Sequence, residues 1–145
     1  VPRAPELTAR RRIEVVAGIL RDAGGRVLIA QRRPGQHGAG FWEFPGGKRA
    51  PGEAATVALG RELDEELGIR VDAAESFLAL EHDYPDRRVV LEFFLVTRFR
   101  GEPVAREGQP LRWVAVGELA GAGLLPADEP VVAALVAGDA ARRDR

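Results

Sequence analysis

The chain has 145 residues, a formal net charge of −1 at pH 7, 46% hydrophobic residues and no cysteine. This length suits one domain with a substantial core, and the small net charge creates no field that would attract nucleic acid or a membrane surface. The lack of cysteine excludes disulfides and thiolate chemistry, and no apolar run is long enough to span a bilayer. We therefore expect a soluble, cytoplasmic monomer that binds neither membranes nor nucleic acid directly.

The first third of the chain predicts an arm, a hairpin and a loop. Residues 1–12 are rich in proline and arginine and are expected to form a flexible arm. Residues 14–21 and 26–32 are predicted strands, and the Asp-Ala-Gly-Gly sequence between them favours a hairpin turn. Residues 34–40 contain three glycines and a proline, which predicts a loop.

Residues 53–67 predict an amphipathic helix. Pro51 and Gly52 precede it and Gly68 follows it, which is typical of a helix start and end. At about 100° per residue, one face of this helix is an apolar stripe that should pack against the body of the protein. The stripe consists of Ala55, Leu59, Leu63 and Leu67.

The same helix carries four carboxylates within five residues. Glu66 falls inside the apolar stripe, Glu62 lies at its edge and Glu65 a little beyond it. Asp64 points to solvent. Like charges at i,i+4, such as Glu62 and Glu66, cost a helix roughly 0.2–0.5 kcal/mol per pair, and a buried ionised carboxylate is expensive unless it is paired. The three glutamates therefore predict a bound cation, and carboxylate oxygens suit Mg²⁺ or Mn²⁺. The alternative is a solvated helix with salt bridges to nearby arginines.

The middle of the chain predicts a second hairpin. Residues 76–84 and 89–99 are predicted strands around a turn at Pro85 and Asp86. Residues 92–96 are too apolar for an exposed strand, so this strand should cross the core.

The C-terminal part predicts one more strand and a short helix. The strand spans residues 111–116, and the helix spans residues 131–137 and starts after Pro130. Residues 13–138 should form the domain, and residues 139–145 a flexible polar tail. Mixed strands with two packed helices predict an α/β sandwich.

The spacing around the acidic helix resembles a known motif. Five residues separate Gly47 from Glu53, and seven more precede the pattern Arg61-Glu62-Leu63-x-Glu65-Glu66-x-Gly68-Ile69. This arrangement is similar to the Nudix box at every defined position. Further segments resemble the MutT branch of that superfamily: residues 42–48, 84–87, 101–103, 106–110 and 126–130. The resemblance covers residues 13–137 and implies a hydrolase with the Nudix fold, a mixed β-sheet between α-helices with a loop-helix-loop metal site.

The resemblance implies a divalent-metal site on the acidic helix. The implied ligands are the carbonyl of Gly46 and the carboxylates of Glu62, Glu65 and Glu66. Mg²⁺ is the expected metal, with Mn²⁺ as the alternative, because both prefer similar oxygen ligands. Gly46 and Gly47 lack a Cβ, so the backbone can approach a metal and a phosphate closely; the same pair would also suit a tight turn into the helix.

Three more residues have roles implied by the resemblance. Glu53 and Arg61 match a supporting ion pair that orients Glu62, although Glu53 would also suit a helix N-terminus, where the macrodipole favours acids. Glu107 matches a MutT-like loop acid that binds metal or activates water, whereas a lone loop glutamate is usually just solvated. The expected catalytic set is therefore Glu53, Arg61, Glu62, Glu65, Glu66 and Glu107.

The MutT resemblance also implies the reaction and the substrate. Water would attack the β-phosphorus of a nucleoside triphosphate, releasing a nucleoside monophosphate and pyrophosphate, and 8-oxo-dGTP would be the substrate in a nucleotide-pool sanitation role. Arg32, Phe44, Arg87 and Asp128 match positions near the nucleotide. The alternatives are surface positions for the two arginines and a core position for Phe44.

Asp128 departs from the MutT pattern, because the MutT proteins most like this chain usually have Asn there. An Asn amide offers one acceptor and one donor, which suits the N7–H and O6 of 8-oxoguanine. An ionised Asp accepts from N7–H but donates to O6 only when it is protonated. Asp also accepts well from the N4 amine of cytosine, so a CTP or 5-methyl-dCTP pyrophosphohydrolase is the alternative enzyme. Asp128 would otherwise cap the helix after Pro130.

A non-catalytic nucleotide-binding Nudix domain is the remaining alternative. Such domains commonly lack part of the acidic set, and this chain retains all of it.

Overall fold

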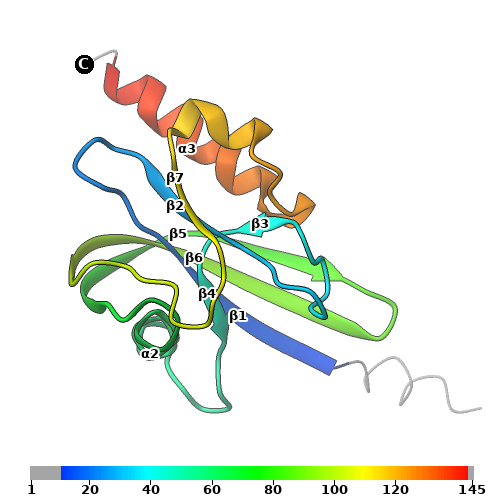
Figure 1. Cartoon of the computed structure of the whole chain (residues 1–145). Coiled ribbons are helices and arrows are strands. Elements are labelled where there is room, and N and C mark those ends of the chain that lie inside the picture. The colour runs from blue at the N-terminus through cyan, green and yellow to red at the C-terminus, as the bar shows by residue number, and fades with distance from the viewer. Residues whose placement is uncertain (1–10, 144–145) are drawn as a thin grey trace, which may run out of the picture.

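The computed structural model describes residues 11–143, which fold around a four-stranded sheet (Figure 1). Strands β1 and β6 are parallel at its centre, and the other pairings are antiparallel, so the sheet is mixed. In the order of the sheet the strands are β4 Gly46–Lys48, β1 Arg11–Ile19, β6 Arg87–Arg100 and β5 Arg70–Asp83. A smaller antiparallel sheet has the order β3 Trp42–Glu43, β2 Val27–Gln31 and β7 Leu111–Val114.

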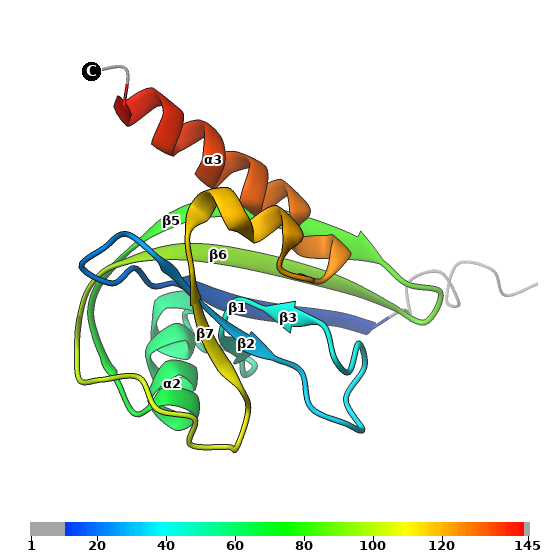
Figure 2. The ribbon, with the colours of Figure 1, turned by 45° about the horizontal axis from the view of Figure 1, so that its top comes forward.

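Within residues 11–143, two α-helices complete the architecture. Helix α2, Ala55–Leu67, and helix α3, Glu129–Arg143, lie on opposite sides of the four-stranded sheet (Figure 2). Two 3₁₀ segments, η1 Val116–Gly121 and η2 Pro126–Asp128, lead into α3. The expected α/β architecture is therefore confirmed. Within residues 11–143, no helix is both long enough and apolar enough to cross a membrane.

Two hydrophobic cores form on the two faces of the four-stranded sheet. Because successive strand residues point to opposite faces, Val16 and Phe94 pack with α2, whereas Ala17 and Phe93 pack with the smaller sheet and α3. Strand β6 thus contributes to both cores, as its apolar composition predicted. The α2 core contains the fully buried stripe Leu59, Leu63 and Leu67. The other core is completed by Leu119, Val131 and Leu135.

Turn and cap residues act as the sequence predicted. Gly68 ends α2 in the left-handed conformation with φ 70°, and its N–H donates to the carbonyl of Asp64 at 2.9 Å. In the β1–β2 turn, the Asp22 carboxylate accepts from the backbone N–H groups of Gly24 and Arg26 at 3.0 and 2.8 Å. These local contacts fix where α2 stops and where the first hairpin reverses.

Several element boundaries differ from the prediction. Strand β1 begins at Arg11, because this end of the strand pairs with the start of β6; residues 1–10 of the predicted arm lie outside the described residues. Helix α3 continues to Arg143, so residues 139–143 are helical and the predicted flexible tail is wrong over that range. Asp139 binds Arg21 at 3.1 Å, and the arginines of the last turn suit the helix C-terminus. Residues 144–145 lie outside the described residues.

Three short features were missed or misplaced. Strands β3 and β4 have only two and three residues, too few for a periodic pattern to reveal them. The predicted strand 111–116 ends at Val114, since the chain turns into the 3₁₀ segment η1 at Val116.

Candidate active site

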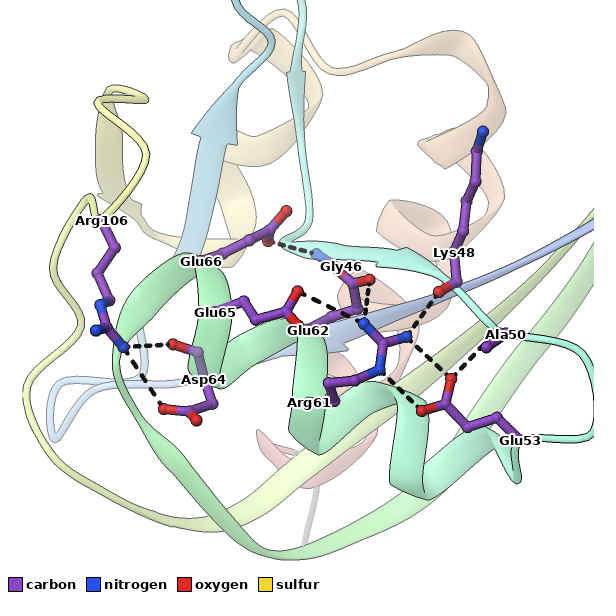
Figure 3. A network of polar contacts seen from close by, with 10 residues as sticks. All are labelled: Gly46, Lys48, Ala50, Glu53, Arg61, Glu62, Asp64, Glu65, Glu66 and Arg106. Carbon is purple, nitrogen blue, oxygen red and sulfur yellow. Dashed lines mark hydrogen bonds and ion pairs between the residues drawn. The ribbon is translucent and has the colours of Figure 1, made fainter.

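The acidic side chains of α2 differ in exposure as their helical positions predict. The Glu62 side chain is 15% exposed and Glu65 is 55% exposed. Asp64 is 69% exposed and lies 3.7 Å from Arg106, on the side away from the other three acids (Figure 3). Glu66 points toward β4 and is partly buried. The acids that could serve one site are therefore the three glutamates, with Asp64 outside it.

Arg61 is the centre of a polar network that fixes Glu62 (Figure 3). Its Nε and Nη2 donate to the two carboxylate oxygens of Glu53 at 2.8 and 2.9 Å, and Nη2 also donates to the Lys48 carbonyl at 3.0 Å. Its Nη1 donates to Glu62 Oε1 at 2.9 Å and reaches Glu65 Oε2 at 3.5 Å. The predicted Glu53–Arg61 ion pair, and its contact with Glu62, are thus confirmed as contacts.

Glu53 lies just outside α2 rather than in its first turn. Helix α2 begins at Ala55, and the Glu53 carboxylate accepts from the Ala50 N–H at 2.9 Å. The hydrogen bonds from Arg61, followed by that from Ala50, lower the pKa of Glu53 to about 2. Glu53 is therefore ionised at neutral pH and serves Arg61 rather than the helix dipole.

Two glycines bring strand β4 directly against α2. The Gly46 N–H donates to Glu66 Oε2 at 3.2 Å. A Cβ on Gly47 would lie 2.2 Å from Glu62 Oε2, and a Cβ on Gly46 would lie 1.9 Å from the Val16 carbonyl oxygen. Both glycines lie in a strand, so they serve close approach rather than a tight turn.

Glu66 faces a small cavity of about 30 Å³ that Glu43, Pro45, Glu107 and Gln109 help to line. Burial, and then the nearby charges of Glu107, Glu62 and Glu43, raise the pKa of Glu66 to about 8. Three glutamates, Glu43, Glu66 and Glu107, line this cavity, and carboxylates are hard, negatively charged donors that fit a divalent cation. Within residues 11–143, no three acidic or imidazole groups already form a metal cluster. The neighbouring acids disfavour the ionised form of Glu66, and a bound cation would offset that repulsion.

A larger cavity of about 360 Å³ lies elsewhere, beside Arg21, Phe99 and Trp113. It includes none of the predicted site residues, and both of its arginines, Arg21 and Arg26, are already paired with aspartates. Its size alone gives no reason to place the chemistry there.

At the other end of the site, Arg32 and Asp128 flank Glu43. Arg32 Nη1 donates to both carboxylate oxygens of Glu43 at 2.9 and 3.2 Å, and its Nε donates to the His37 carbonyl. Asp128 is 3% exposed, and its Oδ2 has no hydrogen-bond partner among the described residues. Burial, together with the charge of Glu43 and against the opposing effect of Arg32, raises the pKa of Asp128 to about 7.

This arrangement argues against a capping role for Asp128. In the described part of the chain, its buried Oδ2 makes no hydrogen bond, including any to the first N–H groups of α3. A buried acid with an unpaired oxygen is costly for the fold, and it is therefore available to a ligand.

The other two predicted nucleotide residues lie differently. Phe44 is 3% exposed and packs edge-to-face on Phe93, with ring centroids 6.1 Å apart, so its side chain belongs to the core. The Arg87 guanidinium lies 4.7 Å over the Tyr84 ring, which also contacts His37. The structure thus brings Arg87 to the loop whose His37 carbonyl binds Arg32.

Sequence reasoning missed two residues of the site, Glu43 and Gln109. Both lie inside segments that resembled the MutT pattern, 42–48 and 106–110, but neither carried a local signal of its own. Glu43 acquires its importance from the buried Asp128 and from Arg32, which are distant in sequence.

The fold and the acidic helix are those of a Nudix hydrolase. The chain belongs to the Nudix family, whose NUDIX domain model matches residues 16–134. It is 40% identical over 125 residues to the 8-oxo-dGTP diphosphatase of Escherichia coli K12, covering 86% of this chain and 97% of that one. It is 41% identical over 130 residues to the CTP pyrophosphohydrolase of the same strain, covering 90% of this chain and 96% of that one.

A solved structure supports the same relationship. The fold matches a MutT structure from work on Aliivibrio salmonicida and Vibrio cholerae with a TM-score of 0.76 and 39% identity, over 88% of this chain and 99% of that one. The MutT-like resemblance and the hydrolase class predicted from the sequence are therefore confirmed. Nudix hydrolases generally use a divalent metal ion.

Proposed function

We propose that this chain is a Mg²⁺-dependent nucleoside triphosphate pyrophosphohydrolase that converts 8-oxo-dGTP to 8-oxo-dGMP and pyrophosphate. The choice of 8-oxo-dGTP as substrate is supported by Asp128. In the described chain, this buried carboxyl group has one oxygen without a hydrogen-bond partner, and its pKa is raised to about 7. When protonated, this group offers one donor and one acceptor, as an Asn amide does. It can then accept from N7–H and donate to O6 of 8-oxoguanine, whereas the N7 of ordinary guanine has no proton to donate.

The metal half of the site follows from the acidic network. Glu62, Glu65, Glu66 and the carbonyl of Gly46 would hold the Mg²⁺ ion, and Glu107 supplies a further carboxylate as a ligand or as the acceptor of a proton from the attacking water. When bound, such an ion neutralises phosphate charge and makes a water molecule more acidic. Arg61, itself held by Glu53, keeps Glu62 aimed into the site.

Arg32 and Arg87 are proposed to bind the nucleotide from one side of the site. Arg32 is partly neutralised by Glu43, whereas Arg87 stacks on Tyr84. In a cell, the proposed reaction would remove oxidised guanine nucleotides before DNA replication uses them. We propose that it takes place in the cytoplasm and that the enzyme is a monomer.

The second candidate is hydrolysis of CTP or 5-methyl-dCTP by the same site. Two observations favour it: the 41% identity to a CTP pyrophosphohydrolase, and the ability of an ionised Asp128 to accept from the N4 amine of cytosine. The acidic machinery would be unchanged, and the base pocket alone would differ.

The test is pyrophosphate release in Mg²⁺ from 8-oxo-dGTP, dGTP, CTP, dCTP and 5-methyl-dCTP, compared by kcat/KM. We expect a large preference for 8-oxo-dGTP over dGTP. A preference for the cytidine nucleotides would favour the second candidate, and binding without pyrophosphate release would contradict both. Asp128→Ala, which removes both the donor and the acceptor, then tests the role of Asp128: we expect the preference for 8-oxo-dGTP over dGTP to fall sharply, and an unchanged preference would remove Asp128 from base recognition.

A further inference from the structure

The loop between β6 and β7, residues 101–110, lies along the C-terminal turn of α2 and carries Glu107. Its backbone N–H groups at Val104 and Arg106 donate to the carbonyls of Leu67 and Glu66 at 3.0 and 3.1 Å. The last carbonyls of a helix have no partner within the helix, so the loop satisfies part of the end of α2. The backbone of the loop is therefore placed relative to the acidic helix.

Gln109 adds a side-chain connection at the same place. It is 7% exposed and is one of two buried polar residues in the described chain, the other being Asp128. Its Nε2 donates to the Glu66 carbonyl at 3.1 Å, and its Oε1 accepts from the Glu107 N–H at 3.0 Å. Because a glutamine amide has one donating and one accepting end, only this orientation satisfies both bonds.

We infer that Gln109 is a positioning residue that sets Glu107 against Glu66, so that the loop acid and the helix acid serve the same cation. The inference rests on the metal-dependent function proposed above. Gln109 itself contributes through its bonds to the Glu66 carbonyl and the Glu107 N–H, which join the backbones of those two residues.

A second contact holds the backbone of Glu107 at its carbonyl. Arg33 Nη1, from the loop between β2 and β3, donates to the Glu107 carbonyl at 2.5 Å. The N–H and the carbonyl of Glu107 are thus both bound, while Glu107 lines the cavity that Glu66 also lines. Freedom at either backbone group would let the Glu107 carboxylate move away from the site.

The first test uses Gln109→Leu, which keeps a similar volume and loses both amide bonds. Mn²⁺ affinity is measured by isothermal titration calorimetry without nucleotide, and exchange of the Glu107 amide hydrogen is measured by NMR. We expect Mn²⁺ affinity to fall roughly 10-fold or more, in line with the loss of groups that orient metal ligands, and the Glu107 amide to exchange faster. If Gln109→Leu does not fold, the unbranched Gln109→Met serves in the same comparison.

Arg106→Leu is the matched control. Arg106 also ties this loop to α2, through an Nη1 bond of 3.0 Å to the Asp64 carbonyl and an ion pair of 3.7 Å with the Asp64 carboxylate. We expect this variant to keep wild-type Mn²⁺ affinity. An equal loss in both variants would mean that general loop anchoring, rather than Gln109, sets the affinity, and would overturn the inference.

A double-mutant cycle with Glu107→Gln separates this inference from the proposed function. If Gln109 acts through Glu107, the double variant binds Mn²⁺ no more weakly than Glu107→Gln alone. If the losses of Mn²⁺ affinity in the two single variants add up in the double variant, the positioning role alone would be overturned. The same holds if Gln109→Leu keeps wild-type Mn²⁺ affinity while Glu107→Gln loses it. Wild-type Mn²⁺ affinity and pyrophosphate release in Glu107→Gln would instead remove Glu107 from the proposed site, and the inference with it.

Discussion

Asp128 and Glu62 show how differently two carboxylates can be held within one protein. Glu62 receives a charged hydrogen bond from Arg61, so its negative charge is stabilised in place. Asp128 has lost its contact with water and has gained no hydrogen bond at Oδ2. A carboxylate in the first situation suits a cation, and one in the second suits a neutral ligand that can share a proton.

Glu62→Gln should abolish turnover and leave the fold intact. The amide oxygen can still accept from Arg61, but it carries no charge for a cation, so we expect kcat to fall by at least about 100-fold, the upper end for residues that merely orient metal ligands. Pyrophosphate release and thermal melting by circular dichroism measure the two effects. Asp64→Asn is the control on the same helix, because Asp64 is 69% exposed and points away from the site. Turnover at the wild-type rate in Glu62→Gln would refute the metal assignment.

Asp128→Asn should change how stability depends on pH. The pKa of Asp128 is raised from 3.8 to about 7 in the folded state, so the folded protein holds this proton more tightly than the unfolded chain does. The contribution of this proton to the free energy of unfolding is therefore fully present below about pH 4 and is lost as the pH rises through about 7. We expect Asp128→Asn to match wild type near pH 4 and to exceed its free energy of unfolding at pH 8 by up to about 4 kcal/mol. Urea unfolding at both pH values tests this, and a difference that does not vary with pH would contradict it.

Among the elements, the fit between β4 and α2 matters most for the site. The strand has only three residues, yet its two glycines let the backbone reach both Glu62 and Glu66. The buried leucine stripe packs helix α2 tightly into its core, so the helix cannot shift to make room for a larger residue on β4.

Gly47→Ala should therefore damage the site more than the fold at large. The new Cβ would lie 2.2 Å from Glu62 Oε2, which forces that carboxylate away from its contact with Arg61. We expect a large fall in kcat and a lower Tm. Gly60→Ala is the opposite case, because beyond its chain neighbours and the helix backbone nothing lies within 4 Å of its added Cβ, and the position is inside α2. That substitution should stabilise the protein by roughly 0.5–1 kcal/mol with normal activity. Equal kcat in the two variants would show that Glu62 tolerates displacement.

The sequence predicted the long elements and the acidic helix well, because their signals are local. The stripe from Leu59 to Leu67, the Gly68 stop and the exposed Asp64 all follow from helical spacing, and the structure confirms them. Strand β4 and the end of α3 were not predictable in this way. The first depends on steric fit to a distant helix, and the second on the long-range Arg21–Asp139 ion pair. The partnership of Gln109 with Glu66 likewise spans 43 residues and has no periodic signature.

For the whole molecule, the repulsion among the site carboxylates should couple metal binding to stability. Burial and the neighbouring acids raise the pKa of Glu66 from 4.5 to about 8. The stabilising contribution of its protonated form is complete below about pH 4.5 and is lost as the pH rises through about 8.

We therefore expect the metal-free protein, held in EDTA, to melt at a lower temperature at pH 8.5 than at pH 6. Mg²⁺ binds the folded state, so it should raise Tm, and should do so more at pH 8.5, where Glu66 is ionised. Melting curves at both pH values with EDTA or Mg²⁺ measure this. In Glu66→Gln the pH-dependent part of the response should shrink, and an equal Mg²⁺ response at both pH values in the wild type would contradict the coupling.

The two cores on opposite faces of the four-stranded sheet have a consequence for how such a protein can diverge. The acidic helix rests on one core, whereas Asp128 is carried by the 3₁₀ segment that leads into α3, on the other. Substitutions that reshape the α3 side can change the surroundings of Asp128, the residue proposed to bind the base, while the core beneath α2 keeps its packing. If the proposed roles hold, a change of base preference requires no change in the packing of the acidic helix. This separation of the two cores agrees with the names of two relatives. One, at 40% identity, is an 8-oxo-dGTP diphosphatase, and the other, at 41% identity, is a CTP pyrophosphohydrolase.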